Sequence, residues 1–166
     1  TEDIQNTLQF SEDLELDWAT HQIYFSYPNT ELFDYSVDND YIERLNLKPG
    51  EIYTPQEISG DDWTHEWVIE TNYLSNLKAN YIYNRNLKNG NYEQALRDFE
   101  YVISRTNNHA LAYKTAAKAA EQIGLTEKAC SYHAMEKQIM SDTDNEFHKW
   151  YDLLSIEKPC IESTNI

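Results

Sequence analysis

The chain has 166 residues, of which 40% are hydrophobic and 13% aromatic, and its net charge is −16. This length and hydrophobic content suffice for one domain with a packed core, and they exclude a low-complexity or wholly disordered chain. No apolar run of about 18 residues is present, so the sequence predicts no membrane-spanning helix and no membrane partner.

The negative charge is concentrated in the first half of the chain. Residues 1–75 contain 17 Asp or Glu against only Arg44 and Lys48, which is a net charge of −15. Residues 76–166 contain 12 acidic and 11 basic residues and are nearly neutral. Because such a field repels phosphates and attracts cations, we expect no direct binding of nucleic acid and a preference for basic partners. The alternative is that the acidic residues only keep the protein soluble.

The two cysteines, Cys130 and Cys160, form no CxxC pair, and the sequence has no Asn-x-Ser/Thr acceptor. Both features are typical of a reducing compartment. The expected localisation is therefore intracellular, either cytoplasmic or nuclear.

Residues 1–60 are expected to form an irregular, acidic and aromatic N-terminal arm that packs on the rest of the chain. Partial disorder is expected to about Glu12, because the apolar residues there are scattered. The stretch HQIYFSYPN is typical of a short extended segment that ends at Pro28-Asn29. Asp38 or Asn39 could cap a short helix that runs through Tyr41, Leu45 and Leu47 to a stop at Pro49-Gly50.

A helical domain is expected over residues 61–155. Asp61 or Asp62 can cap its first helix, and the residues from Trp63 to Lys88 include no Gly or Pro. We therefore predict one long helix over 63–88. The alternative is a break near Thr71-Asn72 that gives two helices.

The stretch from Asn76 to Thr143 repeats itself with a period of 34 residues, so that Gly90 falls on Gly124 and Ala95 on Ala129. A fixed period of this length, with Gly between two apolar-periodic runs, indicates a helix–turn–helix repeat. We define copy one as residues 76–109 and copy two as residues 110–143. Each Gly is expected to end the first helix of its copy in the left-handed conformation. Each Ala is expected to lie where the two helices approach most closely.

Two segments of the repeat, NGNYEQALRDFEYVI and AYKTAAKAAEQIGLTEKACSYHAMEK, resemble sequences of the tetratricopeptide repeat (TPR) family. The resemblance covers about two repeats and departs from the family where Tyr83 replaces a small residue and Asn107 replaces the usual Pro. It implies an all-α fold, in which TPR-like helical hairpins form a fragment of an α-solenoid. It also implies a concave groove that binds extended peptides, and the groove-facing candidates are Asn80, Asn84, Lys88, Thr115 and Lys118.

A closing helix is predicted over residues 144–155, capped by Thr143 or Asp144. Phe147, Trp150, Tyr151 and Leu154 fall on one face, which is expected to cover copy two. Residues 156–166 are predicted to be a flexible tail.

No pattern in the sequence points to chemistry. The five histidines lack metal-ligand spacing, and the four glycines include no phosphate-binding loop. We therefore expect no catalytic residues, no metal and no cofactor, although an enzyme with an unrecognised site is kept as an alternative.

The leading hypothesis is a non-catalytic adaptor or scaffold subunit of a larger assembly, which binds a partner protein or peptide through the helices and the arm. The arm candidates are Asp34, Asp38 and Asp40, which would attract a basic partner. A further alternative is an acidic chaperone or mimic that holds a basic protein. Such a mimic should lose affinity steeply with salt, whereas an adaptor anchored by aromatic groups should lose little.

Overall fold

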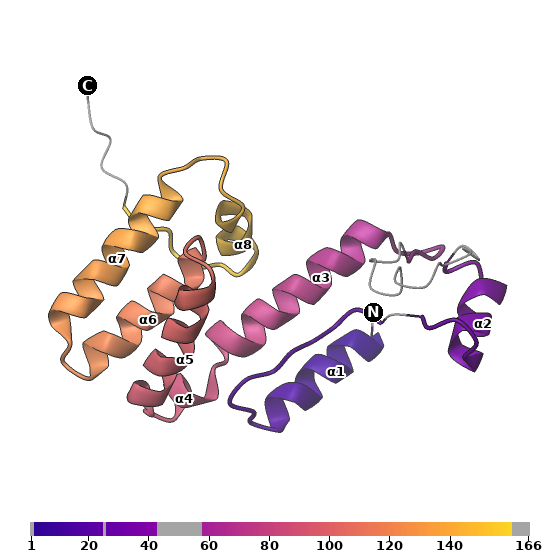
Figure 1. Cartoon of the computed structure of the whole chain (residues 1–166), viewed down its shortest axis with the longest axis horizontal. Helices are drawn as coiled ribbons and strands as arrows, with labels where there is room; N and C mark the ends of the chain where they lie inside the picture. The colour runs from indigo at the N-terminus through magenta and orange to yellow at the C-terminus, as the bar shows by residue number, and fades with distance from the viewer. Residues whose placement is uncertain (1, 25, 43–57, 161–166) are drawn as a thin grey trace. The chain divides into compact units, whose positions relative to one another are not determined.

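The computed structural model describes residues 2–24, 26–42 and 58–160 (Figure 1). The chain divides into unit 1, Thr1–Ala19 with Leu77–Ile166, and unit 2, Thr20–Asn76. The regular structure of the described residues is helical and includes no strand, which confirms the predicted all-α class. The first 19 residues of the arm belong to unit 1, together with the residues from Leu77 onward.

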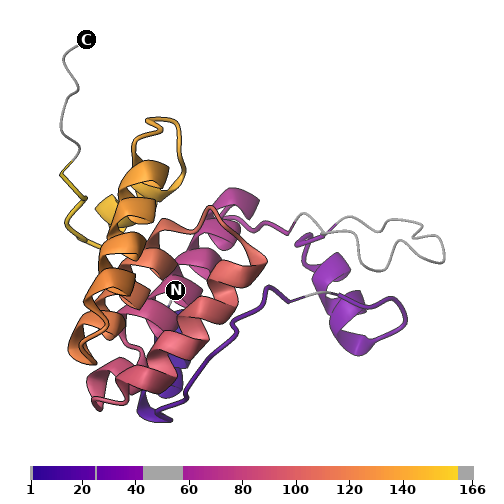
Figure 2. The same cartoon turned by 60° about the vertical axis from the view of Figure 1, so that its left-hand side comes forward.

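The helices of unit 1 that follow Gly90 form a regular array. Helices α5 (Tyr92–Arg105), α6 (Ala110–Gln122) and α7 (Thr126–Met140) pack in chain order, and both views show them side by side (Figures 1 and 2). Small residues allow this close packing, since Ala95 is 0% and Ala129 2% exposed. Gly90 and Gly124 have φ values of 77° and 76°, as predicted for their left-handed turns.

The first helix of copy one is interrupted, so the predicted single helix over 63–88 is wrong. Helix α3 (His65–Leu77) continues into a π-helical turn, η2 (Lys78–Ile82), and a separate short helix, α4 (Arg85–Lys88), follows. The Asn84 side chain caps α4 by accepting a hydrogen bond from the Leu87 amide at 3.0 Å. At the start of α3, the Thr64 hydroxyl accepts from the Trp67 amide at 3.2 Å, in place of the expected Asp61 or Asp62 cap.

The two ends of unit 1 also differ from the predictions. Helix α1 (Glu2–Asp13) occupies the stretch where disorder was expected, with Glu2 and Asp3 in its first turn, where acidic groups stabilise a helix. Helix α8 (Phe147–Leu153) is shorter than predicted, and Asn145 accepts from its first amide at 3.0 Å, rather than Thr143 or Asp144. Most of its predicted face is buried, namely Phe147, Trp150 and Tyr151, whereas Leu154 is only partly buried.

Unit 2 contains helix α2 (Glu31–Asp38), which Thr30 caps, and most of α3. Asp38 and Asn39 were expected to begin a helix, but they end α2, because Thr30 offers the cap eight residues earlier and Phe33 anchors the helix in the unit. The remainder of that expected helix, through Leu45 and Leu47, lies outside the described residues.

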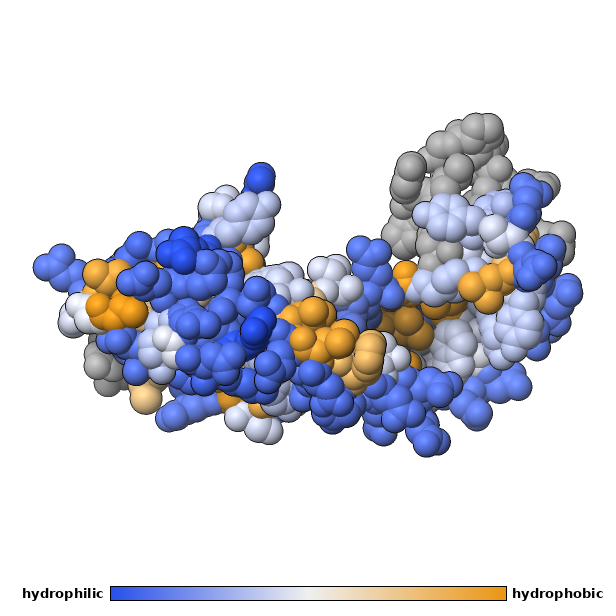
Figure 3. Space-filling view, turned by 90° about the horizontal axis from the view of Figure 1, so that it is seen from below, coloured by the Kyte–Doolittle hydropathy of each residue, from blue (hydrophilic) through white to orange (hydrophobic). Residues whose placement is uncertain are grey.

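The face drawn in Figure 3 is mainly hydrophilic, with apolar patches between the polar side chains. None of the described helices combines the length and the apolar character that crossing a membrane requires.

Candidate functional site

Asn80 binds the backbone of a segment that lies 61 residues earlier in the chain. Its amide nitrogen donates to the Ala19 carbonyl at 2.7 Å, and its amide oxygen accepts from the Ala19 amide at 2.8 Å. The Asn80 side chain is 4% exposed, and Asn84 donates to its carbonyl at 3.0 Å from the neighbouring turn. Because both bonds go to backbone groups, this contact requires a suitably extended segment but no particular side chain.

The residues before Ala19 add side-chain contacts to this backbone contact. The Trp18 ring packs edge-on against Tyr81, with 5.7 Å between centroids. The Asp17 carboxylate lies 3.6 Å from the Arg85 guanidinium, and both side chains are substantially exposed. Asp17, Trp18 and Ala19 thus meet a cation, an aromatic ring and an amide. We call Asn80, Tyr81 and Arg85 the copy-one site.

The platform of this site belongs to the core. Tyr81 is 6% exposed, stacks on Phe99 at 5.6 Å and contacts His109 at 4.9 Å. His109 in turn packs on Phe147 at 4.7 Å, and its Nδ1 caps α6 by accepting from the Ala112 amide at 3.0 Å. Burial lowers the pKa of His109 to about 4, so its ring is neutral near pH 7 and can accept this bond.

A shallow pocket of about 90 Å³ adjoins the copy-one site. Ser11 and Glu12 line it from α1, and Ala79, Tyr83 and Lys88 line it from the interrupted helix. The Lys88 ammonium lies 4.8 Å from the centre of the Tyr83 ring. Charges of both signs and an aromatic ring are therefore available to a segment bound here.

The same kind of amide contact occurs separately in unit 2. Asn76 accepts from the His21 amide and donates to the His21 carbonyl, both at 2.8 Å, and Asn72 donates to the same carbonyl at 2.9 Å. Both ring nitrogens of His21 are buried without a hydrogen-bond partner among the described residues.

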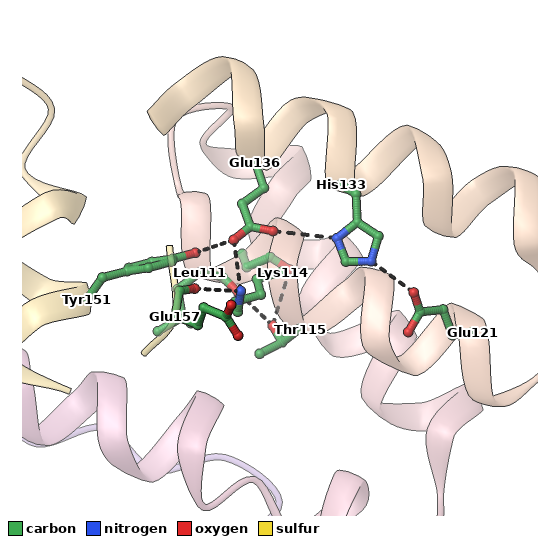
Figure 4. Close-up of polar contacts among 9 residues, drawn as sticks. Leu111, Lys114, Thr115, Glu121, His133, Glu136, Tyr151 and Glu157 are labelled. Atoms are coloured by element: carbon green, nitrogen blue, oxygen red, sulfur yellow. Dashed lines mark hydrogen bonds and ion pairs between the residues drawn. The ribbon is translucent and has the colours of Figure 1, made fainter. Parts of the chain in front are cut away.

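A buried carboxylate joins α6, α7 and α8 (Figure 4). Glu136 is 1% exposed and accepts from the Lys114 ammonium at 3.2 Å and from the Tyr151 hydroxyl at 3.0 Å. His133 lies 3.5 Å from the second oxygen of Glu136 and 2.9 Å from Glu121. Burial, and next the Glu136 charge, raise the pKa of Tyr151, which therefore stays protonated and donates.

Lys114 also binds a backbone group, because it donates to the Glu157 carbonyl at 3.0 Å. Lys114 stands 34 residues after Asn80, at the same position of the repeat. Ile156 donates to the Tyr151 carbonyl at 2.8 Å, and Lys158 lies 2.7 Å from Asp152. The first part of the predicted flexible tail, residues 156–158, is thus held by contacts, and residues 161–166 lie outside the described part of the chain.

The structure places the predicted groove residues in two classes. Asn80, Asn84 and Thr115 are buried and use their side chains in internal hydrogen bonds, Thr115 with the Leu111 and Ala112 carbonyls. Lys88 and Lys118 are exposed, and Lys88 lies at the pocket. The structure brings Asn80, Asn84 and Lys88 together around η2 and α4, whereas Thr115 and Lys118 lie on α6.

The predicted arm residues Asp34, Asp38 and Asp40 are all exposed and lie in or directly after α2. Sequence reasoning missed Arg85, Tyr81 and their partners Asp17 and Trp18. One available signal was the placement of Asn72, Asn76, Asn80 and Asn84 at intervals of four, which is typical of one helical face. In the described residues, no group of His, Cys, Asp and Glu is large enough to suggest a metal site.

No protein-family model matches the chain, and no curated protein and no solved structure matches it. The resemblance to the TPR family therefore stays a prediction.

Proposed function

We propose that this chain is a non-catalytic adaptor subunit, related to TPR proteins, that binds an extended segment of a partner protein. The observation that carries the proposal is the two-way hydrogen bond between Asn80 and the Ala19 backbone. Elongated peptides are commonly recognised through backbone hydrogen bonds, with neighbouring pockets for alternate side chains. The adjoining pocket and the aromatic platform of Tyr81 supply such neighbours.

A second observation has the same form. Lys114 holds the Glu157 backbone at the equivalent position of copy two. In both copies, a polar side chain at one position of the repeat holds the backbone of a flanking segment. A repeated position with this chemistry supports a general capacity to hold extended chain along the first helices of the copies.

Site-specific cross-linking tests the proposal. A photo-reactive amino acid at Lys88, beside the pocket, should capture a defined partner in cells, and an added Arg85→Ala substitution should reduce that capture. Arg97, an exposed residue of α5, is the matched control position. Identical capture from positions 88 and 97, unaffected by Arg85→Ala, would contradict binding at this site.

The acidic surface of α2 supports a second candidate, an acidic chaperone or mimic for a basic protein. Leu32 is 51% and Tyr35 55% exposed, and they stand beside Asp34 and Asp38 on the same short helix. Reversing Asp34, Asp38 and Asp40 to Lys should then slow association of a basic partner several-fold and leave dissociation nearly unchanged. Stopped-flow kinetics at two salt concentrations would measure this, and an association rate indifferent to both changes would exclude it.

A further inference from the structure

We propose that the copy-one site recognises an extended segment of the form acidic–aromatic–small, and that the chain's own Asp17-Trp18-Ala19 occupies it until a partner with that sequence competes. The inference rests on the proposed function, since it names the partner segment and the regulation of the same site. The tripeptide and the copy-one site all belong to unit 1.

Each position of the tripeptide meets a group that selects it. Ala19 is 9% exposed, so a larger side chain at this position has little room. Trp18 makes a T-shaped contact with the ring of Tyr81, and Phe99 and His109 pack against Tyr81 and hold it in place. Asp17 faces Arg85, which favours an acidic residue. Together these contacts favour an acidic, an aromatic and a small side chain at three consecutive positions, while Asn80 binds the backbone.

The platform does not depend on the arm for its own position. Tyr81 is packed by residues of α5 and α6's cap, and Asn84 holds the Asn80 carbonyl through the turn that starts α4. A site whose contact groups are fixed in advance loses little side-chain entropy when a segment binds. The site should therefore remain competent when Asp17-Trp18-Ala19 leaves.

The occupying segment is weakly anchored, which makes exchange feasible. Helix α1 has no buried residue, and Phe10, Leu14 and Leu16 are 62%, 50% and 46% exposed. Trp18 itself is 39% exposed, and the Asp17–Arg85 pair is a surface ion pair, of a class that contributes little to stability. Segments with few buried contacts open at free energies far below that of global unfolding.

Occupation by the same chain sets the affinity that a partner experiences. A tethered segment competes at an effective concentration in the millimolar range, and the apparent dissociation constant rises as the open fraction falls. Weakening the tethered segment should therefore tighten binding of the same sequence when it is supplied as a separate peptide. A purely structural role of Asp17-Trp18-Ala19 predicts no such gain.

The test uses the full chain and a labelled peptide that spans residues 12–22. Fluorescence anisotropy should show weak binding to the unchanged chain and at least tenfold tighter binding to a chain with Asp17→Lys and Trp18→Ala. Both substitutions are at partly exposed side chains, and thermal melting checks that the variant stays folded. Adding Arg85→Ala to that chain should reduce this gain, whereas the control Arg97→Ala should not.

A second peptide, carrying the same Asp→Lys and Trp→Ala changes, separates the possible outcomes. Preference of the opened chain for the unaltered peptide supports the inference. Equal binding of both peptides would overturn the acidic–aromatic preference and leave the proposed function standing. Failure of the opened, folded chain to bind either peptide would overturn both, because the Asn80 contact would then serve only the fold.

Discussion

Copy one and copy two share one 34-residue frame, yet only copy two begins with an uninterrupted helix. Ala116 and Ala117 are both 0% exposed in α6, where their small side chains allow close packing against the neighbouring helices. The equivalent residues of copy one, Ile82 and Tyr83, are each 38% exposed, and the helix stops directly after Ile82. A tyrosine ring would not fit the close contact that Ala117 makes, and at the equivalent place in copy one the helix ends and Asn84 caps a new one.

The interruption gives copy one a surface that copy two lacks. Asn84 starts a new helical turn, and Arg85 points from it to Asp17 across 3.6 Å. The residue equivalent to Arg85 in copy two is Ala119, which is 0% exposed. The comparison indicates that, where the helix is interrupted, a position that is buried in copy two can carry a charged residue that makes a surface contact in copy one. The π-helical turn before the break is a feature that often accompanies functional sites.

The largest effect should follow from giving copy two a residue of copy one. Ala117→Tyr places a phenol ring at a position without exposed surface, so we expect a loss of about 3 kcal/mol or more in the free energy of unfolding. Urea unfolding followed by far-UV circular dichroism measures the loss. The neighbouring Lys118→Tyr is the control, because Lys118 is exposed and such changes cost within about 0.5 kcal/mol. An unchanged midpoint for Ala117→Tyr would contradict the close contact.

A smaller loss is expected when copy two loses its buried carboxylate. Glu136→Ala leaves Lys114 and the Tyr151 hydroxyl without their shared acceptor, and the expected cost is about 3 kcal/mol at most, since the Lys114 side chain is 32% exposed. Hydrogen exchange of the Ile156 amide should also accelerate, because Lys114 then holds Glu157 less firmly. Lys158→Ala, at a surface ion pair, is the control. Unchanged stability and exchange would show that the cluster does not hold the C-terminal segment.

The third effect concerns His109, which joins the copies. Its folded pKa of about 4 lies below the ordinary value of 6.5, so the unfolded chain binds a proton first as the pH falls. The stabilisation is complete above about pH 6.5 and is lost down to about pH 4, which amounts to about 2 kcal/mol between pH 7.5 and pH 5.

The comparison variant for this measurement is His109→Asn, which keeps a capping oxygen for the Ala112 amide but does not titrate. Chemical unfolding of both proteins across this range should show a steeper loss for the unchanged chain. Parallel pH profiles would exclude His109 as the source.

The regular array could be predicted because local pattern and packing agree there. The repeat predicted turns at Gly90 and Gly124 and close helix contacts at Ala95 and Ala129. The structure confirms both predictions. The end of the first helix of copy one after Ile82 could not be predicted in this way. Tyr83 was recognised as a departure from the small residue of the repeat pattern. Sequence alone does not decide whether the neighbouring helix moves to accommodate the ring or the helix that carries Tyr83 ends.

The candidate site depended on information that local pattern does not carry. Asn80 was chosen as a groove residue, but its contact with Ala19 joins residues 61 positions apart, and the spacing of the Asn residues does not name that partner. Helix α1 was missed for a related reason, since it has few apolar residues, Ile4, Leu8 and Phe10, and it buries no residue. The acidic content of the arm could be counted from the sequence, whereas the pairing of Asp17 with Arg85 became apparent only in the structure.

The smallest effect should come from the reverse exchange, in which copy one receives a residue of copy two. Tyr83→Ala removes a partly exposed ring and its contact with the Lys88 ammonium, a type of contact that contributes about 0.5–1 kcal/mol at exposed sites. Alanine favours helix more than tyrosine does, which offsets part of this loss. The Asn84 cap and the Asn80–Ala19 bonds do not involve the ring, so the break should persist. We therefore expect a change within about 0.5 kcal/mol in urea unfolding. A loss comparable to that of Ala117→Tyr would mean that Tyr83 is packed as tightly as its counterpart, and the contrast between the copies would then have a different cause.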